Sequence, residues 1–355
     1  MFNSKVALES LCLPMPTMTQ PARFLVSMFA ALLLTSAHLD AQTYRELTQF
    51  KLPAAATSGL AVDSQSRKLF VGTADGVAVL NADSGASLGS IGGITRTHDV
   101  LLVPPAEDDE HAKISKGFAA DDSGHLIAFS VTDLKPMASL KLPTAGPVSL
   151  CFDTEANAVE AVSAGGSIVS VDAQSNKIIK SGQLPTGAGA IACGILHQVY
   201  VADPAANVVR VLNHETIADE GDFRIMTGHK PSGLVLEPKG RRLFVTCEDG
   251  NIEVIDTDAG FPFIELKGGT GEAHETFAWL PQGKGQWKAA AFIAQDDGTL
   301  SSVRMNAFIN YSLAGQYKLA RGIRSIVFDE KTRHLFIVSS EAEPAVLVVG
   351  YEPIS

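Results

Sequence analysis

The stretch GLAVDSQSRKLFVGTADGVAVLNADSG, from Gly59 to Gly85, returns later in the chain as GLVLEPKGRRLFVTCEDGNIEVIDTDAG, from Gly233 to Gly260. Each copy has three short apolar runs, and polar residues with glycine separate the runs, which is typical of β-strands joined by tight turns. Because the copies lie about half the chain apart, we expect more diverged copies between them. Finding those copies decides the fold.

Seven units of this kind can be aligned along the chain, and each contains short strands over roughly 40 to 50 residues. In six of them a turn joins the second and third strands, with the sequences ADG, DDSG, AGG, DPAAN, EDG and QDDG. One four-stranded antiparallel sheet cannot bury both of its faces, so such units stack around an axis. The sequence therefore predicts an all-β fold, a seven-bladed β-propeller.

The seventh unit ends with only three strands, and the missing strand is predicted at the other end of the chain. TYRELTQFKLP, from Thr43 to Pro53, ends like the fourth strands MASLKLP and IIKSGQLP. We predict that this N-terminal strand completes the last blade, which removes an open sheet edge. Residues 42–355 would then form a single propeller domain.

Residues 1–41 are predicted to be a leader with a Sec-type signal peptide. The apolar run from Phe24 to Thr35 has the length of a signal core, small residues follow it, and it is too short to span a membrane comfortably. The segment before it is unusual for a signal, so Met15 and Met18 are alternative starts. We expect export to the periplasm or beyond without stable membrane insertion, and an uncleaved anchor is the alternative.

The net charge of the chain and the spacing of its basic residues indicate whether it binds nucleic acid. The formal net charge is −11, and Lys and Arg are spread singly along the sequence. Nucleic-acid binding needs a clustered basic face. We therefore expect no nucleic-acid partner.

Four cysteines occur, and Cys12 lies in the leader. The other three, Cys151, Cys193 and Cys247, each lie in an apolar run, and an odd number leaves at least one unpaired within a monomer. We interpret them as small buried hydrophobic residues, and a Cys151–Cys193 bridge is the alternative. The sequence contains no C-x-x-C pair, no haem-attachment motif and no zinc-ligand spacing.

Two stretches, Leu243–Gly260 and Val199–Ile217, resemble the YVTN-type β-propeller repeat, and GHKPSGLVLEP resembles the start of such a blade. The chain from the end of the leader onwards is similar to YncE-like seven-bladed propellers of the bacterial cell envelope. Blades two, three and six depart from the repeat pattern. The resemblance implies a binding or scaffold protein that requires no cofactor, and we expect a monomer with an unidentified protein or small-molecule ligand.

Ligands of propellers meet the ring at a mouth of its central channel, where the loops before the inner strands converge. Alignment places one residue of each blade there: Ser58, His98, Val148, Gly189, Ser232, Glu275 and Arg324. With their neighbours, the predicted ligand-binding residues are Arg96, His98, Asp99, His229, His274, Glu275, Arg321 and Arg324. Imidazole and carboxylate suit zinc or another divalent metal, so His98, His274 and Glu275 form a candidate metal site. A polar, hydrated mouth without a specific ligand is the alternative.

No catalytic constellation stands out, since the sequence has no G-x-S-x-G elbow. The alternative function is a metal-assisted, lactonase-like hydrolase with its site at the channel mouth. Lactonase-like propellers hold a metal with Glu, Asn and Asp, and here Glu275 and Asp99 match in type while no Asn takes a matching position. A redox partner is disfavoured because haem-attachment cysteines are missing. The acidic insert Pro105–Lys113 is interpreted as a solvated surface loop, and Trp279 and Trp287 as packing residues.

Overall fold

The computed structural model describes residues 43–105, 113–194, 198–237, 241–283, 286–307, 310–341 and 345–352. The predicted leader, most of the acidic insert and the side chain of Trp287 lie outside the described residues. Strands and turns make up the described part. Among those residues there is no helix with the length and apolarity that crossing a membrane requires.

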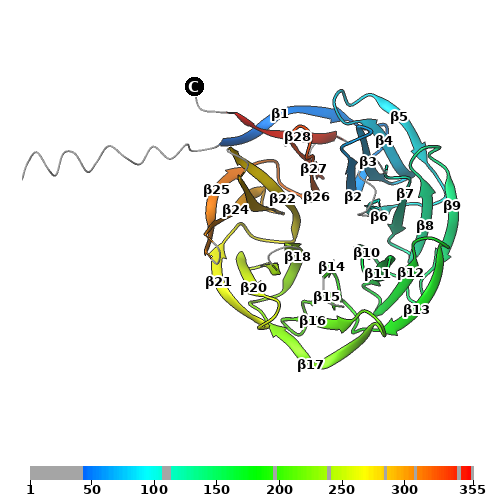
Figure 1. Ribbon diagram of the computed structural model, residues 1–355. Helices are drawn as coiled ribbons and strands as arrows, with labels where there is room; N and C mark the ends of the chain where they lie inside the picture. Colours follow the sequence, from blue (N-terminus) through cyan, green and yellow to red (C-terminus); the bar gives the residue numbers. More distant parts are fainter. Residues whose placement is uncertain are drawn as a thin grey trace, which may run out of the picture. The chain divides into compact units, whose positions relative to one another are not determined.

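The strands form seven four-stranded antiparallel sheets arranged around a central opening (Figure 1). Blade one contains β2 (Ala56–Asp63), β3 (Lys68–Thr73), β4 (Gly76–Asn81) and β5 (Ser87–Ile91). Blade two contains β6 (Thr97–Leu102), β7 (Lys116–Asp121), β8 (His125–Ser130) and β9 (Pro136–Lys141). Blade three contains β10 (Val148–Asp153), β11 (Ala158–Ser163), β12 (Ser167–Asp172) and β13 (Lys177–Gln183). The prediction of a seven-bladed propeller is confirmed.

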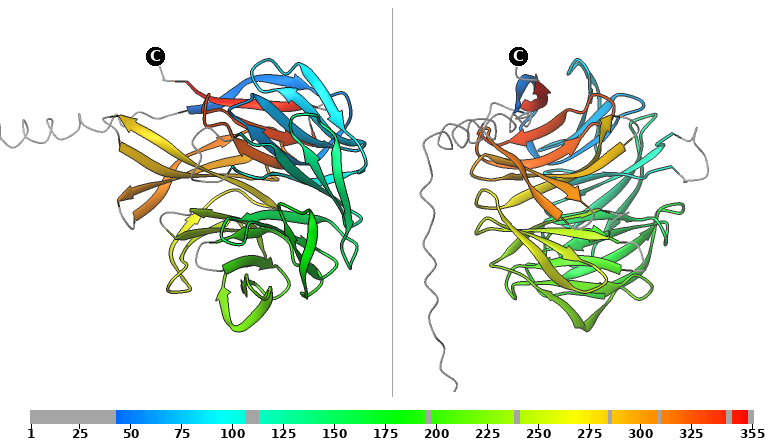
Figure 2. Two further views of the ribbon diagram at one scale, coloured as in Figure 1. Left: turned by 45° about the vertical axis from the view of Figure 1, so that its right-hand side comes forward. Right: turned by 60° about the vertical axis from the view of Figure 1, so that its left-hand side comes forward.

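The remaining blades follow the same order from the channel outwards. Blade four contains β14 (Ile191–Cys193), β15 (Gln198–Asp203), β16 (Val208–Asn213) and β17 (Ala218–Met226). Blade five contains β18 (Pro231–Glu237), β19 (Arg242–Cys247), β20 (Asn251–Asp256) and β21 (Phe261–Lys267). Blade six contains β22 (Ala273–Gly283), β23 (Gln286–Gln295), β24 (Thr299–Ala307) and β25 (Asn310–Lys318). β22 and β23 are the longest described strands, and they extend beyond the neighbouring blades (Figure 2).

The last blade is completed by the N-terminal strand. It contains β26 (Ile323–Phe328), β27 (Leu335–Ser339) and β28 (Ala345–Glu352), with β1 (Thr43–Lys51) as the fourth strand. β1 runs antiparallel to β28, from Thr43 opposite Glu352 to Lys51 opposite Ala345. The predicted closure is therefore confirmed, and the beginning and end of the described chain lie side by side (Figure 1).

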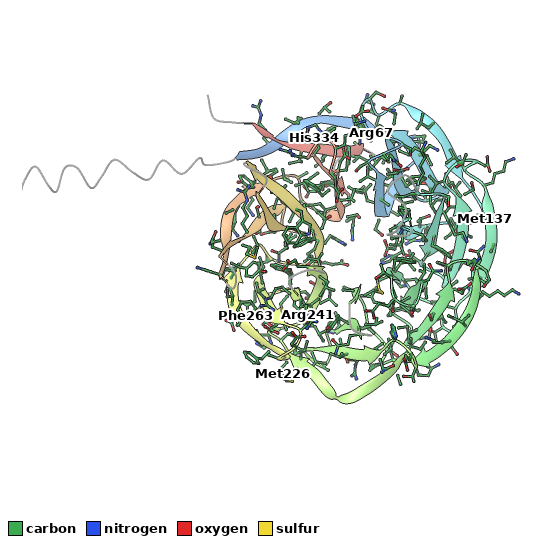
Figure 3. All side chains as sticks on the ribbon, in the orientation of Figure 1. Arg67, Met137, Met226, Arg241, Phe263 and His334 are labelled. Carbon is green, nitrogen blue, oxygen red and sulfur yellow. A yellow bond between two sulfur atoms is a disulfide. The ribbon has the colours of Figure 1, made fainter. Side chains whose placement is uncertain are left out.

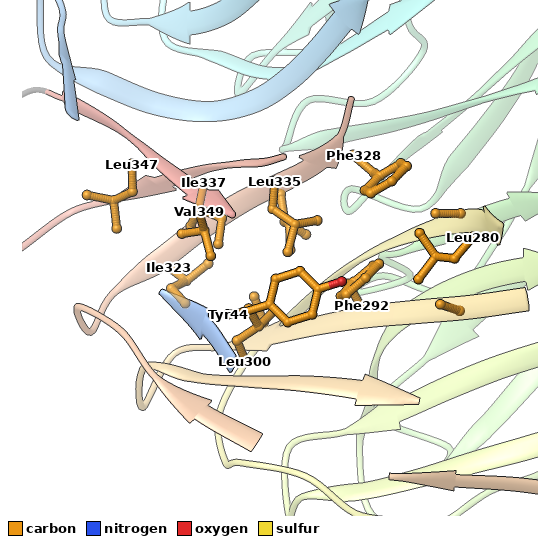
Figure 4. Packing of buried hydrophobic residues seen from close by; sticks show 14 residues of the cluster. Tyr44, Leu280, Phe292, Leu300, Ile323, Phe328, Leu335, Ile337, Leu347 and Val349 are labelled. Carbon is orange, nitrogen blue, oxygen red and sulfur yellow. The ribbon is translucent and has the colours of Figure 1, made fainter. Parts of the chain in front are cut away.

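The core is divided among the joints between blades. Seven clusters of buried apolar side chains are described, one between each pair of adjacent blades. Second strands such as β11 are buried along their whole length, because neighbouring blades cover both faces. Tyr44 of β1 enters the cluster between blades six and seven, where its ring centre lies 5.2 Å from that of Phe292 (Figure 4). The N-terminal strand thus contributes to two interblade cores, since Phe50 packs between blades seven and one.

Acidic residues that end the inner strands cap the following turns. Oδ1 of Asp63 accepts hydrogen bonds from the backbone N–H groups of Gln65 and Ser66, at 3.0 and 3.1 Å. Such side-chain caps satisfy backbone donors that the sheet leaves free. The acidic residue at the end of this inner strand therefore has a local structural role.

One of these acids also joins the last blade to the first. The guanidinium of Arg67 donates to Asp329 from Nη1 to Oδ1 at 2.8 Å, and both side chains are buried. Burial alone would raise the pKa of Asp329, but hydrogen bonds from Arg67, Ser64 and Thr332 lower it to about 2. His334 lies beside Arg67 at the same joint (Figure 3). Ring closure thus combines strand pairing with a buried ion pair.

A disulfide joins blades three and four. Cys151 on β10 is bonded to Cys193 on β14, whereas Cys247 is a free, buried cysteine. The favoured interpretation of all three as unpaired hydrophobic residues was wrong for this pair, and the alternative bridge is correct. The inner strands of adjacent blades bring the two Cα atoms within 5.6 Å, a proximity that their separation of 42 residues does not reveal. β14 has only three residues, so the bridge reinforces a short inner strand.

Replacement of both bridged cysteines by serine is expected to lower the free energy of unfolding by about 2–3 kcal/mol, because the bridge restricts the unfolded chain. Urea unfolding without reductant measures the difference. The Cys247→Ala variant is the matched control, because it keeps the bridge and should lose stability on addition of reductant as the wild type does. A wild-type stability that reductant leaves unchanged would contradict the prediction.

Candidate binding site

A cavity of about 890 Å³ lies at the end of the ring where the inner strands begin. All seven blades contribute to its lining, for example Ser58 from blade one, Ser149 from blade three and Ser232 from blade five. This volume is in the range of small-molecule sites. The loops before the inner strands therefore converge on one space, as the alignment of the units predicts.

The predicted site residues divide into two groups by their position. Six of the eight line the cavity: Arg96, His98, Asp99, His274, Glu275 and Arg324. His229 and Arg321 are not among its lining residues. Of the positions aligned one to a blade, Val148 is also outside the lining, because it points into the interblade core while Pro147 and Ser149 on either side face the cavity.

Arg96 and His98 already have a partner in the structure. Asp122, in the turn after β7, accepts from Arg96 at 2.9 Å and lies 3.4 Å from Nδ1 of His98. Ser58 Oγ lies 3.4 Å from the same ring nitrogen and donates to the His98 carbonyl at 2.7 Å. A Ser-His-Asp triad needs the serine and the carboxylate on different nitrogens. The three residues therefore do not form one, and the pairing role of Asp122 was missed, although its turn DDSG was recognised.

Asp99 links blades two and three through hydrogen bonds to backbone N–H groups. Oδ1 accepts from the N–H of Val100, and Oδ2 accepts from the N–H of Leu150 on the next blade, both at 2.8 Å. Burial raises the pKa of Asp99. Because both oxygens are occupied by backbone donors, Asp99 is positioned to hold the inner strands of blades two and three together.

His274 and Glu275 open the inner strand of blade six and present buried polar atoms without partners. Nε2 of His274 and Oε1 of Glu275 are inaccessible to solvent and make no hydrogen bond within the described residues. Burial, with the charges of His98 and Arg324, lowers the pKa of His274 to about 4. Burial raises the pKa of Glu275 to about 8. At neutral pH the imidazole is therefore neutral and the carboxyl group keeps its proton.

The side chain of Glu275 occupies space beside Gly233 on the adjacent blade. A Cβ atom at Gly233 would lie 1.9 Å from Oε1 of Glu275. Any other residue at position 233 would displace the carboxyl group or the strand. The repeat that marks blade five in the sequence therefore also shapes the site.

Arg324 lines the cavity and has no ion-pair partner among the described residues. It lies at a bulge in β26, between Ile323 and Ser325, which leaves it without a cross-strand partner. Its side chain is exposed, and it makes no ion pair or hydrogen bond with the described residues. Arg96 differs from it, because Asp122 neutralises Arg96. Arg324 can therefore meet an anionic group without breaking an existing pair.

The candidate metal residues fit a metal only in part. In the described part of the chain, no group of three or more His, Cys, Asp or Glu side chains is arranged to hold a metal ion. Of the three predicted ligands, His274 has a buried nitrogen without a partner, His98 faces Asp122, and Glu275 has a raised pKa. The metal site stays a prediction.

Comparisons with known proteins identify the fold. No family model matches the sequence, and no curated protein matches it. Solved structures do match, among them a chain from "Crystal Structure of Mitotic Checkpoint Complex", with 15% identity, a TM-score of 0.69, and coverage of 99% of this chain and 100% of that one. At this identity the similarity shows the propeller fold alone.

Proposed function

We propose that this protein is an exported, YncE-like binding protein of the bacterial cell envelope that takes its ligand at the channel mouth. The observation that carries the proposal is the pair His274 and Glu275, two residues of the cavity lining whose buried atoms Nε2 and Oε1 have no hydrogen-bond partner among the described residues. Buried polar groups in native proteins are nearly always hydrogen-bonded, so such atoms point to a bound group. Arg324 adds an unpaired charge to the same space.

The proposed location outside the cytoplasm has two supports. Disulfides persist in oxidising compartments such as the periplasm, and this chain has one between Cys151 and Cys193. The sequence before the first strand also has the features of an export signal. Fractionation of cells that express the full chain tests the location, and a cytoplasmic protein with both cysteines reduced would contradict it.

The proposed role as a binding protein agrees with how the fold is used elsewhere. The matched structure belongs to an assembly, the mitotic checkpoint complex. A rigid ring supports loops that differ from blade to blade. In this chain those loops bring small residues from some blades and charged residues from others to the mouth.

A thermal-shift screen of small molecules, with a variant that obstructs the mouth, tests the proposal. Ala164 lies in the turn after β11 and lines the cavity, so Ala164→Trp places a large ring there. Ala259→Trp is the matched control, because Ala259 is exposed in the turn between β20 and β21. We expect compounds that raise the melting temperature of the wild type and the control but not of Ala164→Trp. Compounds that stabilise all three proteins equally would place the site elsewhere.

A metal-assisted, lactonase-like hydrolase is the second candidate, because His274 offers an open buried nitrogen to a metal. Metal analysis of the purified protein, with His98→Ala and His274→Ala variants, separates the two candidates. A stoichiometric metal that both variants lose would favour the hydrolase. Its absence from the wild type would favour the binding protein.

A further inference from the structure

The lining of the mouth differs in chemistry between opposite sides of the ring. Blades three and four contribute uncharged side chains, among them Pro147, Leu150, Ala164, Ala188, Ile191 and Pro204. Blades six and seven, across the ring from them, contribute His274, Glu275 and Arg324 (Figure 1). A ligand that fills the cavity therefore meets polar groups at one end and small apolar surfaces at the other.

The polar half favours an anionic group. Asp99 and Asp122 are already satisfied, by backbone N–H groups and by Arg96 respectively. Glu248 is paired with Lys230 at 3.2 Å, and Glu272 is exposed at the rim, where solvent and salt screen its charge. Arg324 is left without a counter-charge among the described residues. Arginine recognises carboxylates through two parallel hydrogen bonds.

The groups beside Arg324 complement a carboxylate. Arg324 shares the cavity lining with His98 and His274. Glu275 also lines the cavity, next to His274 on the inner strand of blade six. Nε2 of His274 and Oε1 of Glu275 have no hydrogen-bond partner among the described residues and are closed to solvent, so a ligand gains contacts with them when these side chains turn towards the cavity.

The lining also argues against aromatic and sugar ligands. Among the described residues that line the cavity there is no Phe, Tyr or Trp. Sites that hold rings by stacking use such side chains. An aliphatic group, by contrast, needs only apolar surface, which blades three and four supply through Leu150 and Ile191.

We propose that the ligand of the mouth is an aliphatic carboxylate, with its head group at Arg324, His274 and Glu275 and its chain against blades three and four. This inference rests on the proposed function, because it names the ligand class of the same site.

Calorimetric titration of the full-length protein with the linear carboxylates from butanoate to decanoate, and with the matched primary alcohols, tests the ligand class. We expect the carboxylates to bind, with affinity that rises up to about fourfold for each methylene buried, and the alcohols to bind at least tenfold more weakly. Arg324→Gln should weaken carboxylate binding about tenfold or more. Arg333→Gln is the matched control, because Arg333 is exposed beyond the opposite end of β26, and it should bind as the wild type does.

Other outcomes separate this inference from the proposed function. Alcohols that bind as tightly as carboxylates, or an Arg324→Gln variant with unchanged affinity, would overturn the assignment of the head group. Affinity that does not depend on chain length would overturn the assignment of the apolar half. If no carboxylate binds but another compound stabilises the wild type and not Ala164→Trp, the ligand class is wrong and the mouth is still a binding site. If nothing binds at the mouth, both proposals fail.

Discussion

A chain that lacks Thr43–Lys51 is expected to aggregate instead of folding. The deletion removes β1, so β28 becomes an exposed, apolar edge strand, and such edges pair with other chains. It also removes Tyr44 and Phe50, which belong to the cores on the two sides of the last blade. Size-exclusion chromatography with circular dichroism measures the outcome, and a monomeric, folded protein would contradict the proposed role of β1 in closure.

A single substitution gives a graded form of the same test. Tyr44→Ala is expected to lower the free energy of unfolding by about 3–4 kcal/mol, because it empties a space among Phe292, Tyr317 and their neighbours. Gln49→Ala is the matched control, because Gln49 lies on the same strand and its side chain is exposed. We expect a change within about 0.5 kcal/mol for the control. Equal losses in the two variants would show that closure does not depend on the core contact.

Replacement of Glu275 by glutamine is expected to stabilise the protein at alkaline pH. Burial raises the pKa of Glu275 from 4.5 to about 8, so the folded protein holds a proton that the unfolded chain releases. Stability from this group is fully present below pH 4.5, falls as the pH rises towards 8, and is constant above that. The total loss corresponds to about 5 kcal/mol. Glutamine has no such loss, so we expect the variant to exceed the wild type by about 2–4 kcal/mol at pH 9 and much less at pH 5.

Urea unfolding at pH 5 and pH 9 measures this difference. Glu160 and Glu253 also have raised pKa values through burial, but they are present in both proteins and their effects cancel in the comparison. Glu265→Gln is the control, because Glu265 is an exposed carboxylate on β21. A Glu275→Gln variant with the same pH dependence as the wild type would show that Glu275 ionises freely. An acid that lowers stability at working pH is common at functional sites.

The site residues were predicted by aligning the units, and this alignment places a residue at the mouth only to within one position along the strand. Six of the eight predicted residues line the cavity, because the loops before the inner strands converge in any closed ring. The shift at Val148 arises from strand alternation, which a count by alignment cannot resolve to one residue. In blade four only Gly189 was predicted at the mouth. Its neighbours Gly187, Ala188, Ala190 and Ile191 also line the cavity and were missed, since their sequence resembles any turn.

The sequence by itself determined the number of blades, the order of the strands and the closure by Thr43–Pro53, because each unit repeats its own turns and apolar runs at short range. Only the tertiary structure decided which polar side chains have a hydrogen-bond or ion-pair partner. Asp99 and Asp122 have hydrogen-bond or ion-pair partners, whereas Nε2 of His274, Oε1 of Glu275 and the guanidinium of Arg324 have none among the described residues, although all five residues line one cavity. Those partners come from other blades or from turns many residues away. Burial and pairing across a ring are properties of three-dimensional contact, which local sequence patterns do not contain.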